Sequence, residues 1–356
     1  MILTHIKLVD FRGYERLDLD LGPKGNLILG PNASGKTNLA EAIHFLSLAR
    51  SFRTSEDENL IRHGQEIAVI EADIQEEAMH RTLRIEIGKK GKRIFLNEKP
   101  LRRLSELSKA INVIVYAPSD AALFYGGPSE RRAFLDIGLS KQSEDYFRLI
   151  SRFNRILKER NIALKKRSDD KMLLDALTDQ LIEVAEPIVR YRTMYVASLN
   201  EVLPRVIGAL RGDQAKAKIV YRSFAKDDGN FRENAKRAYE ESLEGDILKK
   251  STSIGPQRED FTFRLNGKDI SEFGSQGENR IAALALKLCP YFLIEDEGRK
   301  PICVLDDVTS ELDANHRERL LFFLNELGQT FLTATDSTLH GDTVIDISAH
   351  RSNRRN

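Results

Sequence analysis

Apolar and polar positions alternate at the start of the chain. LTHIKLV (3–9) and LDLDL (17–21) have the period of two that half-buried strands show, and NLIL (26–29) is typical of a fully buried strand. NLAEAIHFLSLA (38–49) has its apolar residues at helical spacing. The pattern therefore predicts strands that lead into a glycine-containing loop at 30–38, and a helix that follows this loop.

Four more strand patterns occupy the next part of the chain. They are AVIEADI (68–74), TLRIEIG (82–88), RIFLNEK (93–99) and NVIVY (112–116). Glycines at 88 and 91 predict a hairpin turn between the second and third of them. We expect this region to be an antiparallel meander.

The pattern changes to long, charged, amphipathic helical stretches between about Pro128 and Glu244, where KIVYRS (218–223) indicates a strand. Strand and helix patterns alternate again after GPQREDFTFRLNGK: a helix at 279–295, the buried strand ICVLDD (302–307), a helix near 316–326, and the strands TFLTAT and TVIDI. The predicted fold class is an α/β core with an antiparallel subdomain and an inserted, mainly helical lobe. The expected divisions are 1–127, 128–250 and 251–356.

Composition limits the classes of protein to which the chain can belong. The chain has 356 residues, 41% of them hydrophobic, and a formal net charge of +1, which permits a sizeable core and leaves room for local charged patches. It shows neither a run of roughly 20 apolar residues nor a signal-peptide pattern in MILTHIKLVD, so we expect a cytoplasmic protein. Cys289 and Cys303 lack C-x-x-C spacing, which argues against a disulfide framework or a zinc site.

The loop GPNASGKTN has the spacing G-x-x-x-x-G-K-T between a strand and a helix, which predicts a phosphate-binding P-loop. Gly30 and Gly35 let backbone N–H groups approach phosphates. Lys36 is predicted to reach the β and γ phosphates, and Thr37 to place its hydroxyl on Mg²⁺. The predicted nucleotide-binding residues are Gly30, Pro31, Asn32, Ala33, Ser34, Gly35, Lys36, Thr37 and Asn38.

A P-loop needs an acidic partner, and ICVLDD supplies one at the end of a buried strand. We expect Asp306 to bind Mg²⁺, and Asp307 to polarise the attacking water. Taken alone, the two aspartates are more typical of an ordinary strand end followed by a turn, and it is their pairing with the P-loop that favours the functional interpretation. The Asn/Thr-Lys-x-Asp pattern of GTP-binding proteins is absent, with AKDD (225–228) the nearest approach, so the nucleotide is predicted to be ATP.

Two short segments indicate which class of P-loop protein the chain resembles. FGSQGENR (273–280) and TSELD (309–313) each look like a turn followed by a helix cap. Together, in the order P-loop, serine-glycine segment, acidic strand and SELD, these segments nevertheless resemble the head of the ABC-type ATPases. In that class Ser275 and Gly277 would contact the nucleotide held by the P-loop of a second copy, so that ATP binding drives homodimerisation.

A longer set of segments resembles the RecF family of bacterial recombination mediators, which are relatives of the SMC ATPases. The set is FRGYERLDLDL, the P-loop, YAPSDAALFYGGPSERRAFLD (116–136), IGPQRED, FGSQGENR and VLDDVTSELD. The resemblance implies an ATP-dependent dimer on double-stranded DNA, weak DNA-stimulated ATP hydrolysis, and cooperation with RecO and RecR in loading recombinase at gaps during DNA repair and the SOS response. The chain departs from the family pattern at Gln257, where we expect histidine, and at Glu278, where we expect glutamine.

The basic run 148–167 suggests a surface for DNA. Arg148, Arg152 and Arg155 are spaced to share one helical face, which is typical either of contacts to DNA phosphates or of a solvated helix. The insertion, at about 120 residues, is far shorter than an SMC coiled coil, which favours a compact clamp.

Other readings remain open at this point. A transporter ATPase subunit would predict a switch histidine, but the corresponding segment is LTATDS (332–337), where Thr335 or Asp336 is the candidate sensor of the γ phosphate. A small-molecule kinase would leave the serine-glycine segment and SELD unexplained.

Overall fold

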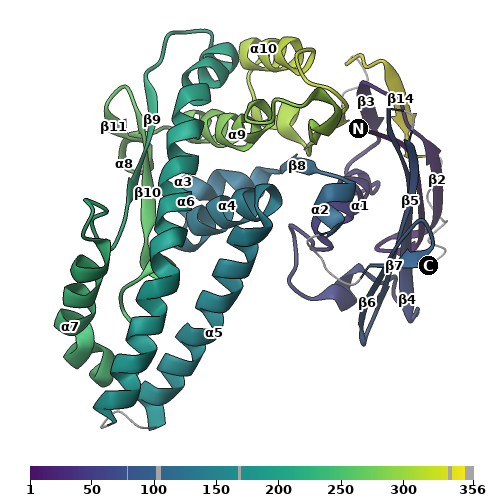
Figure 1. The fold of residues 1–356 in the computed structure, drawn as a ribbon. Helices are drawn as coiled ribbons and strands as arrows, with labels where there is room; N and C mark the ends of the chain where they lie inside the picture. Colours follow the sequence, from purple (N-terminus) through teal and green to yellow (C-terminus); the bar gives the residue numbers. More distant parts are fainter. Residues whose placement is uncertain (78, 102–105, 167–169, 336–338, 349–356) are drawn as a thin grey trace. The chain divides into compact units, whose positions relative to one another are not determined.

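The structure, a computed structural model, describes residues 1–77, 79–101, 106–166, 170–335 and 339–348 (Figure 1). Backbone contacts divide the chain into two units. The first unit comprises Met1–Ala121, Arg205–Gln214 and Gln276–Asn356, and the second comprises Ala122–Pro204 and Ala215–Ser275. These limits differ from the expected boundaries, because the segment 251–275 packs with the helical unit and the short segment 205–214 packs with the P-loop unit.

A parallel five-stranded sheet forms the centre of the first unit. Its strand order is β14-β3-β13-β12-β8, and all neighbouring strands are parallel. The strands are β3 (Gly25–Leu29), β8 (Val113–Tyr116), β12 (Ile302–Leu305), β13 (Thr330–Ala334) and β14 (Thr343–Asp346). Every residue of β12 and β13 is buried, as expected of strands covered on both faces.

An antiparallel six-stranded sheet forms the second layer of this unit, with the order β2-β1-β4-β5-β6-β7. Its strands are β1 (Ile2–Phe11), β2 (Tyr14–Asp20), β4 (Ile67–Glu76), β5 (Met79–Gly88), β6 (Gly91–Leu96) and β7 (Lys99–Pro100). The predicted meander is therefore correct for its first three strands but wrong for NVIVY. That segment is β8, which pairs with β12 in the parallel sheet. Its continuous apolar run lacks the polar alternation of a half-buried strand.

Helix α1 (Lys36–Leu48) joins the two sheets through one apolar core. Ten of its 13 residues are buried, and Leu39, Ile43 and Leu46 pack in a cluster with residues from strands of both sheets. The remaining elements of the unit are η1 (Asp57–Leu60), α2 (Leu107–Ala110), η3 (Pro118–Ala121), α9 (Gln276–Phe292), η5 (Glu297–Arg299), η6 (Val308–Glu311) and α10 (Ala314–Leu324). The start of α1, and with it the P-loop, is fixed by this core.

The second unit is mainly helical, and α5 and α6 run side by side as its longest helices (Figure 1). Its helices are α3 (Ala122–Tyr125), α4 (Pro128–Gln142), α5 (Glu144–Lys166), α6 (Lys171–Arg211), α7 (Phe231–Lys249), η4 (Pro256–Arg258) and α8 (Ile270–Phe273). The end of α6, from Arg205, belongs to the first unit. A three-stranded sheet has the order β11-β10-β9, with β9 (Ala217–Arg222), β10 (Asp260–Leu265) and β11 (Lys268–Asp269).

Two buried arginines organise polar contacts inside the helical unit. Arg160 donates to Asp246 at 2.8 Å and to Thr252 at 2.8 Å, and its guanidinium lies over the ring of Tyr239. This residue of the basic run therefore faces the interior.

Arg192 makes the other buried set of contacts, donating to Asp136 at 2.8 Å and to Glu259 at 2.9 Å. Glu259 also accepts a hydrogen bond from Tyr221. The segment IGPQRED, which contains Glu259, thus serves the packing of the helical unit.

Two further sequence features can be placed. Cys289 and Cys303 are both buried free thiols. Across the described ranges, the structure contains no helix with the length and apolar character needed to span a bilayer.

We predict that Arg160→Met destabilises the protein by about 3–5 kcal/mol, because it leaves the Asp246 carboxylate buried without its cation. The free energy of unfolding would be measured by urea denaturation, followed by circular dichroism of the helical signal. Arg155→Met, an exposed arginine of the same helix, is the matched control and should change stability by less than about 0.5 kcal/mol. Equal losses in the two variants would contradict a structural role for the buried arginine.

Candidate functional site

The loop between β3 and α1 has a backbone that side chains would obstruct. Gly35 has φ of 111°, and a Cβ there would lie 2.7 Å from the Tyr14 hydroxyl oxygen. A Cβ on Gly30 would lie 2.5 Å from Oγ of Ser34. Ala33 also has a positive φ, of 60°. Gly35 is therefore favoured by its backbone conformation and by close packing, and Gly30 by close packing alone.

Lys36 points back into this loop. Its Nζ donates to the carbonyl oxygens of Gly30 at 2.6 Å and Pro31 at 2.9 Å. Burial lowers the pKa of Lys36, while the negative charges of Asp307 and Asp306 act to raise it. Nearby, Oγ of Ser34 is buried and has no hydrogen-bond partner among the described residues. The loop thus offers an ammonium group and a hydroxyl donor to a bound anion.

Asp306 links the P-loop helix to the parallel sheet. Its Oδ1 accepts hydrogen bonds from Thr37 at 3.1 Å and from Thr333 of β13 at 2.9 Å. Burial raises the pKa of Asp306, and the hydrogen bonds from Thr333 and Thr37 lower it. The predicted pair of Mg²⁺ ligands, Thr37 and Asp306, therefore lies together.

Asp307 follows directly in a left-handed backbone conformation, with φ of 50° and ψ of 26°. Its backbone N–H donates to the Thr333 hydroxyl at 2.8 Å. A non-glycine residue in this region of φ/ψ is held there by its surroundings, which is common at functional sites. Thr333 thus sets the positions of both aspartates, a role that no motif or spacing in the sequence indicates.

A second group that the sequence motifs do not reveal surrounds the fully buried Glu41 of α1. Arg12 donates to both carboxylate oxygens, at 2.8 and 2.7 Å, and Ser51 donates to one of them. Arg53 donates to Glu41 at 3.4 Å and to Asn38 at 2.9 Å, and its charge helps to lower the pKa of Asp306. The sequence feature from which this group could have been predicted is the glutamate inside the apolar helix NLAEAIHF. A carboxylate buried in such a helix requires a cationic partner.

The serine-glycine segment lies at the start of α9. Ser275 belongs to the second unit and Gly277 to the first. A Cβ added at Gly277 would meet nothing within 4 Å, so this residue faces open space.

In the SELD segment, Asp313 accepts a hydrogen bond from the backbone N–H of His316 and caps α10. Thr335 is exposed after β13, and Asp336 lies outside the described residues.

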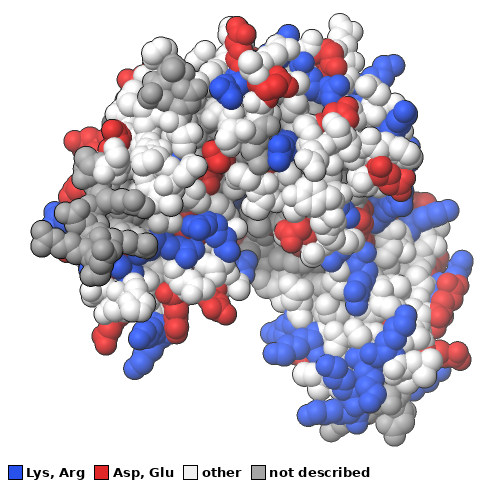
Figure 2. Space-filling view, turned by 180° about the vertical axis from the view of Figure 1, so that it is seen from behind, with Lys and Arg blue, Asp and Glu red and all other residues white. Residues whose placement is uncertain are grey.

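The three arginines proposed for DNA differ in their surroundings. Arg148 donates to Glu144 at 2.6 Å, and Arg152 donates to Glu183 at 3.3 Å. Arg155 is exposed, as are Lys158, Lys165 and Lys166 on the same helix. Figure 2 shows lysine and arginine side chains gathered at its lower right, over the far end of α5 and α6. Positive charge is therefore concentrated toward the end of α5 rather than at Arg148.

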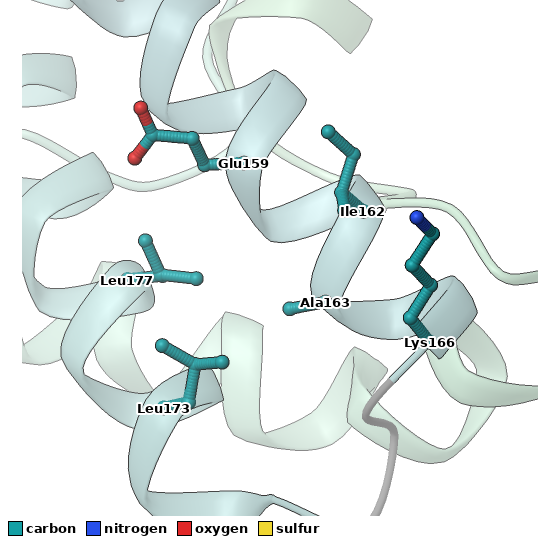
Figure 3. Close-up of a pocket in the computed structure, with 6 residues that line it drawn as sticks. All are labelled: Glu159, Ile162, Ala163, Lys166, Leu173 and Leu177. Atoms are coloured by element: carbon teal, nitrogen blue, oxygen red, sulfur yellow. The ribbon is translucent and has the colours of Figure 1, made fainter.

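A cavity of about 360 Å³ lies between α5 and α6 (Figure 3). It is lined by Glu159, Ile162, Ala163, Lys166, Leu173 and Leu177. Four of these side chains are apolar, and the one cation, Lys166, lies at the rim of the cavity beside Ile162 (Figure 3). This lining suits apolar groups rather than a nucleotide phosphate.

The P-loop site, in contrast, fits a magnesium nucleotide. Ser34 has a free hydroxyl donor, and Lys36 supplies positive charge. Thr37 and Asp306 provide the hydroxyl and carboxylate oxygens that Mg²⁺ prefers. Asp307 lies beside them, with a carboxylate that can accept a hydrogen bond from water.

Comparison with known proteins agrees with this chemistry. Residues 2–353 match the family described as RecF/RecN/SMC N terminal domain. The chain is 37% identical to the DNA replication and repair protein RecF of Halalkalibacterium halodurans over 362 residues, covering 98% of each chain. It is 38% identical to the protein of that name in Bacillus velezensis, covering 94% of this chain and 93% of that one.

Solved structures match as well. One is described as the recombination mediator protein RecF-ATP in the RecFOR pathway, with a TM-score of 0.89 and 32% identity over 97% of this chain and 95% of that chain. The SMC head domain of Pyrococcus furiosus has a TM-score of 0.59 at 14% identity over 97% of this chain and 93% of that chain, which shows a shared fold.

We predict that Thr333→Val lowers ATP turnover about tenfold or more, because a hydrogen bond to a charged group contributes about 1.5–3 kcal/mol. Loss of this bond to the ionised carboxylate should also raise the pKa of Asp306. Activity that needs the ionised form is lost as the pH falls through that pKa, so the acid limb of the kcat/KM profile should move to higher pH. Thr333→Ser keeps the hydroxyl and should keep the wild-type profile. An acid limb at the same pH in Thr333→Val would contradict this role.

Proposed function

The chain belongs to the RecF family of SMC-related ATPases, and from that premise we propose that it is an ATP-dependent DNA clamp of recombinational repair. ATP joins two copies on double-stranded DNA near single-strand gaps, and slow, DNA-stimulated hydrolysis releases them. The clamp cooperates with RecO and RecR in loading recombinase. The RecFOR pathway in the description of the matching RecF structures supports this partnership.

One observation carries the proposal: the chain contains a P-loop half-site together with a signature segment that faces open space. Lys36, Thr37 and Asp306 form the half-site, whereas Gly277 has nothing within 4 Å of an added Cβ. A second copy placed across a two-fold axis would bring its Ser275 and Gly277 to this nucleotide. Two ATP molecules would then be buried between two protomers, which links nucleotide binding to dimerisation.

Each residue has a distinct part in the proposed hydrolysis. Lys36 would exchange the carbonyls of Gly30 and Pro31 for the β and γ phosphates. Thr37 and Asp306 would hold Mg²⁺, which neutralises phosphate charge when bound. Asp307 would orient the attacking water. Arg53, fixed by Asn38 and Glu41, adds positive charge on this side of the helix.

The proposed DNA surface lies on α5. Arg148, Arg152 and Arg155 share one helical face by spacing, but Glu144 and Glu183 already neutralise the first two. We therefore assign the larger share of phosphate contacts to Arg155 and Lys158, which are both exposed.

We predict that Ser275→Arg still binds ATP but no longer dimerises with it, because a long cation would occupy the place of the partner's nucleotide. Sedimentation velocity with and without ATP and double-stranded DNA would measure the dimer, and equilibrium dialysis would measure ATP binding. Lys36→Met is the matched control, and it should lose ATP binding and dimerisation together. A Ser275→Arg dimer that depends on ATP, or a wild-type dimer that forms equally without nucleotide, would contradict the composite site.

We also predict that the double variant Arg155→Gln, Lys158→Gln binds double-stranded DNA more weakly and with a flatter salt dependence. The slope of log K against log salt should fall by about 0.9 for each phosphate contact that is lost. Arg148→Gln, which removes an arginine already paired with Glu144, is the control and should change the slope less. An unchanged slope in the double variant would contradict the proposal and would mean that Arg155 and Lys158 face solvent without contacting DNA phosphates.

A further inference from the structure

Glu278 places a negative charge in the signature segment. It lies one residue after Gly277, in the first turn of α9. Its side chain is 38% exposed. The proposed function brings the phosphates of ATP to this segment, and a free carboxylate there would repel them. The chain therefore needs a means of neutralising this group.

Arg211, the last residue of α6, reaches Glu278. Its Nη1 donates to Oε1 of Glu278 at 3.3 Å. Its Nε and Nη2 donate to Asp213, at 3.2 and 3.1 Å. The guanidinium group is planar and permanently charged, so bonds to Asp213 on one edge fix the direction of Nη1. The Arg211 side chain is only 17% exposed, which limits screening by solvent.

The backbone of Arg211 is held in place by the rest of the first unit. Gly212 ends α6 with φ of 78°, and a Cβ there would lie 2.0 Å from Cζ of Arg319 on α10. Arg205 donates to Glu326 at 2.6 Å, and its guanidinium lies 4.8 Å from the ring centre of Phe292 at the end of α9. The last turns of α6 are thus fixed to α9 and α10, and this attachment brings Arg211 to the beginning of α9.

We propose that Arg211 is a positioning residue of the composite nucleotide site. It neutralises Glu278 and holds the carboxylate back, so that the signature segment accepts the phosphates of ATP bound to a second copy. Arg211 acts through Glu278 and does not contact the nucleotide. This inference rests on the proposed ATP-dependent dimer. It adds to that proposal the residue that allows a signature segment containing Glu278 to lie against the phosphates of ATP.

Three variants test the inference: Arg211→Met, Glu278→Gln, and the two changes combined. ATP-dependent dimerisation would be measured by sedimentation at several salt concentrations. Arg211→Met should weaken dimerisation about tenfold, in the usual range for coupled sites. Its defect should shrink as salt rises, because salt screens the repulsion. Glu278→Gln should dimerise at least as tightly as wild type.

The combined variant separates electrostatics from packing. It lacks the same arginine, yet it should dimerise like Glu278→Gln, because no carboxylate is left to repel the phosphates. ATP binding by the monomer should be equal in all variants, which also shows that they are folded. Wild-type dimerisation in Arg211→Met, or a combined variant as weak as Arg211→Met, would overturn the inference alone. A wild-type protein that stays monomeric with ATP would instead overturn the proposed function and the inference with it.

Discussion

The carboxylate of Asp306 has to be ionised to bind a cation although it is only 3% exposed, and three segments of the chain are arranged to meet this constraint. Burial favours the neutral acid. Hydroxyl groups from Thr37 on α1 and Thr333 on β13 stabilise the ionised form. The parallel sheet holds β12 and β13 side by side, and the apolar core fixes α1 against them. The position of the acidic group is thus a property of the whole first unit.

Other carboxylates around the site are also paired with groups that stabilise their negative charge. Glu41 is buried against Arg12 and Arg53, and Glu278 is paired with Arg211. In each pair the partners come from separate segments of the chain, so the local charge is set by the fold. Charge pairs of this kind can place positive and negative groups around ATP, although the chain as a whole is near neutral, with a net charge of +1.

The elements that the sequence predicts best are those with a local signal. The P-loop, its flanking strand and helix, and the acidic strand end at Asp306 follow from periodicity and spacing within a few residues. The pairing of β8 does not, because a short apolar run fits a meander as well as a parallel sheet. By spacing alone Arg160 belongs to a basic surface, since its partner Asp246 lies 86 positions away. Thr333 and Arg53 escape prediction for the same reason: nothing near them in the sequence identifies their contacts with Asp306, Glu41 and Asn38.

The central claim is that each nucleotide is held by the P-loop of one copy and the signature of another. Mixing Lys36→Met protein with Ser275→Arg protein tests it most directly, by measuring ATP turnover of the mixture. In a mixed dimer, one site combines the damaged P-loop with the damaged signature, while the other combines an intact P-loop with an intact signature. The account predicts turnover above the sum of the two variants measured separately, rising as their concentrations rise together. A mixture no more active than that sum would contradict a composite site.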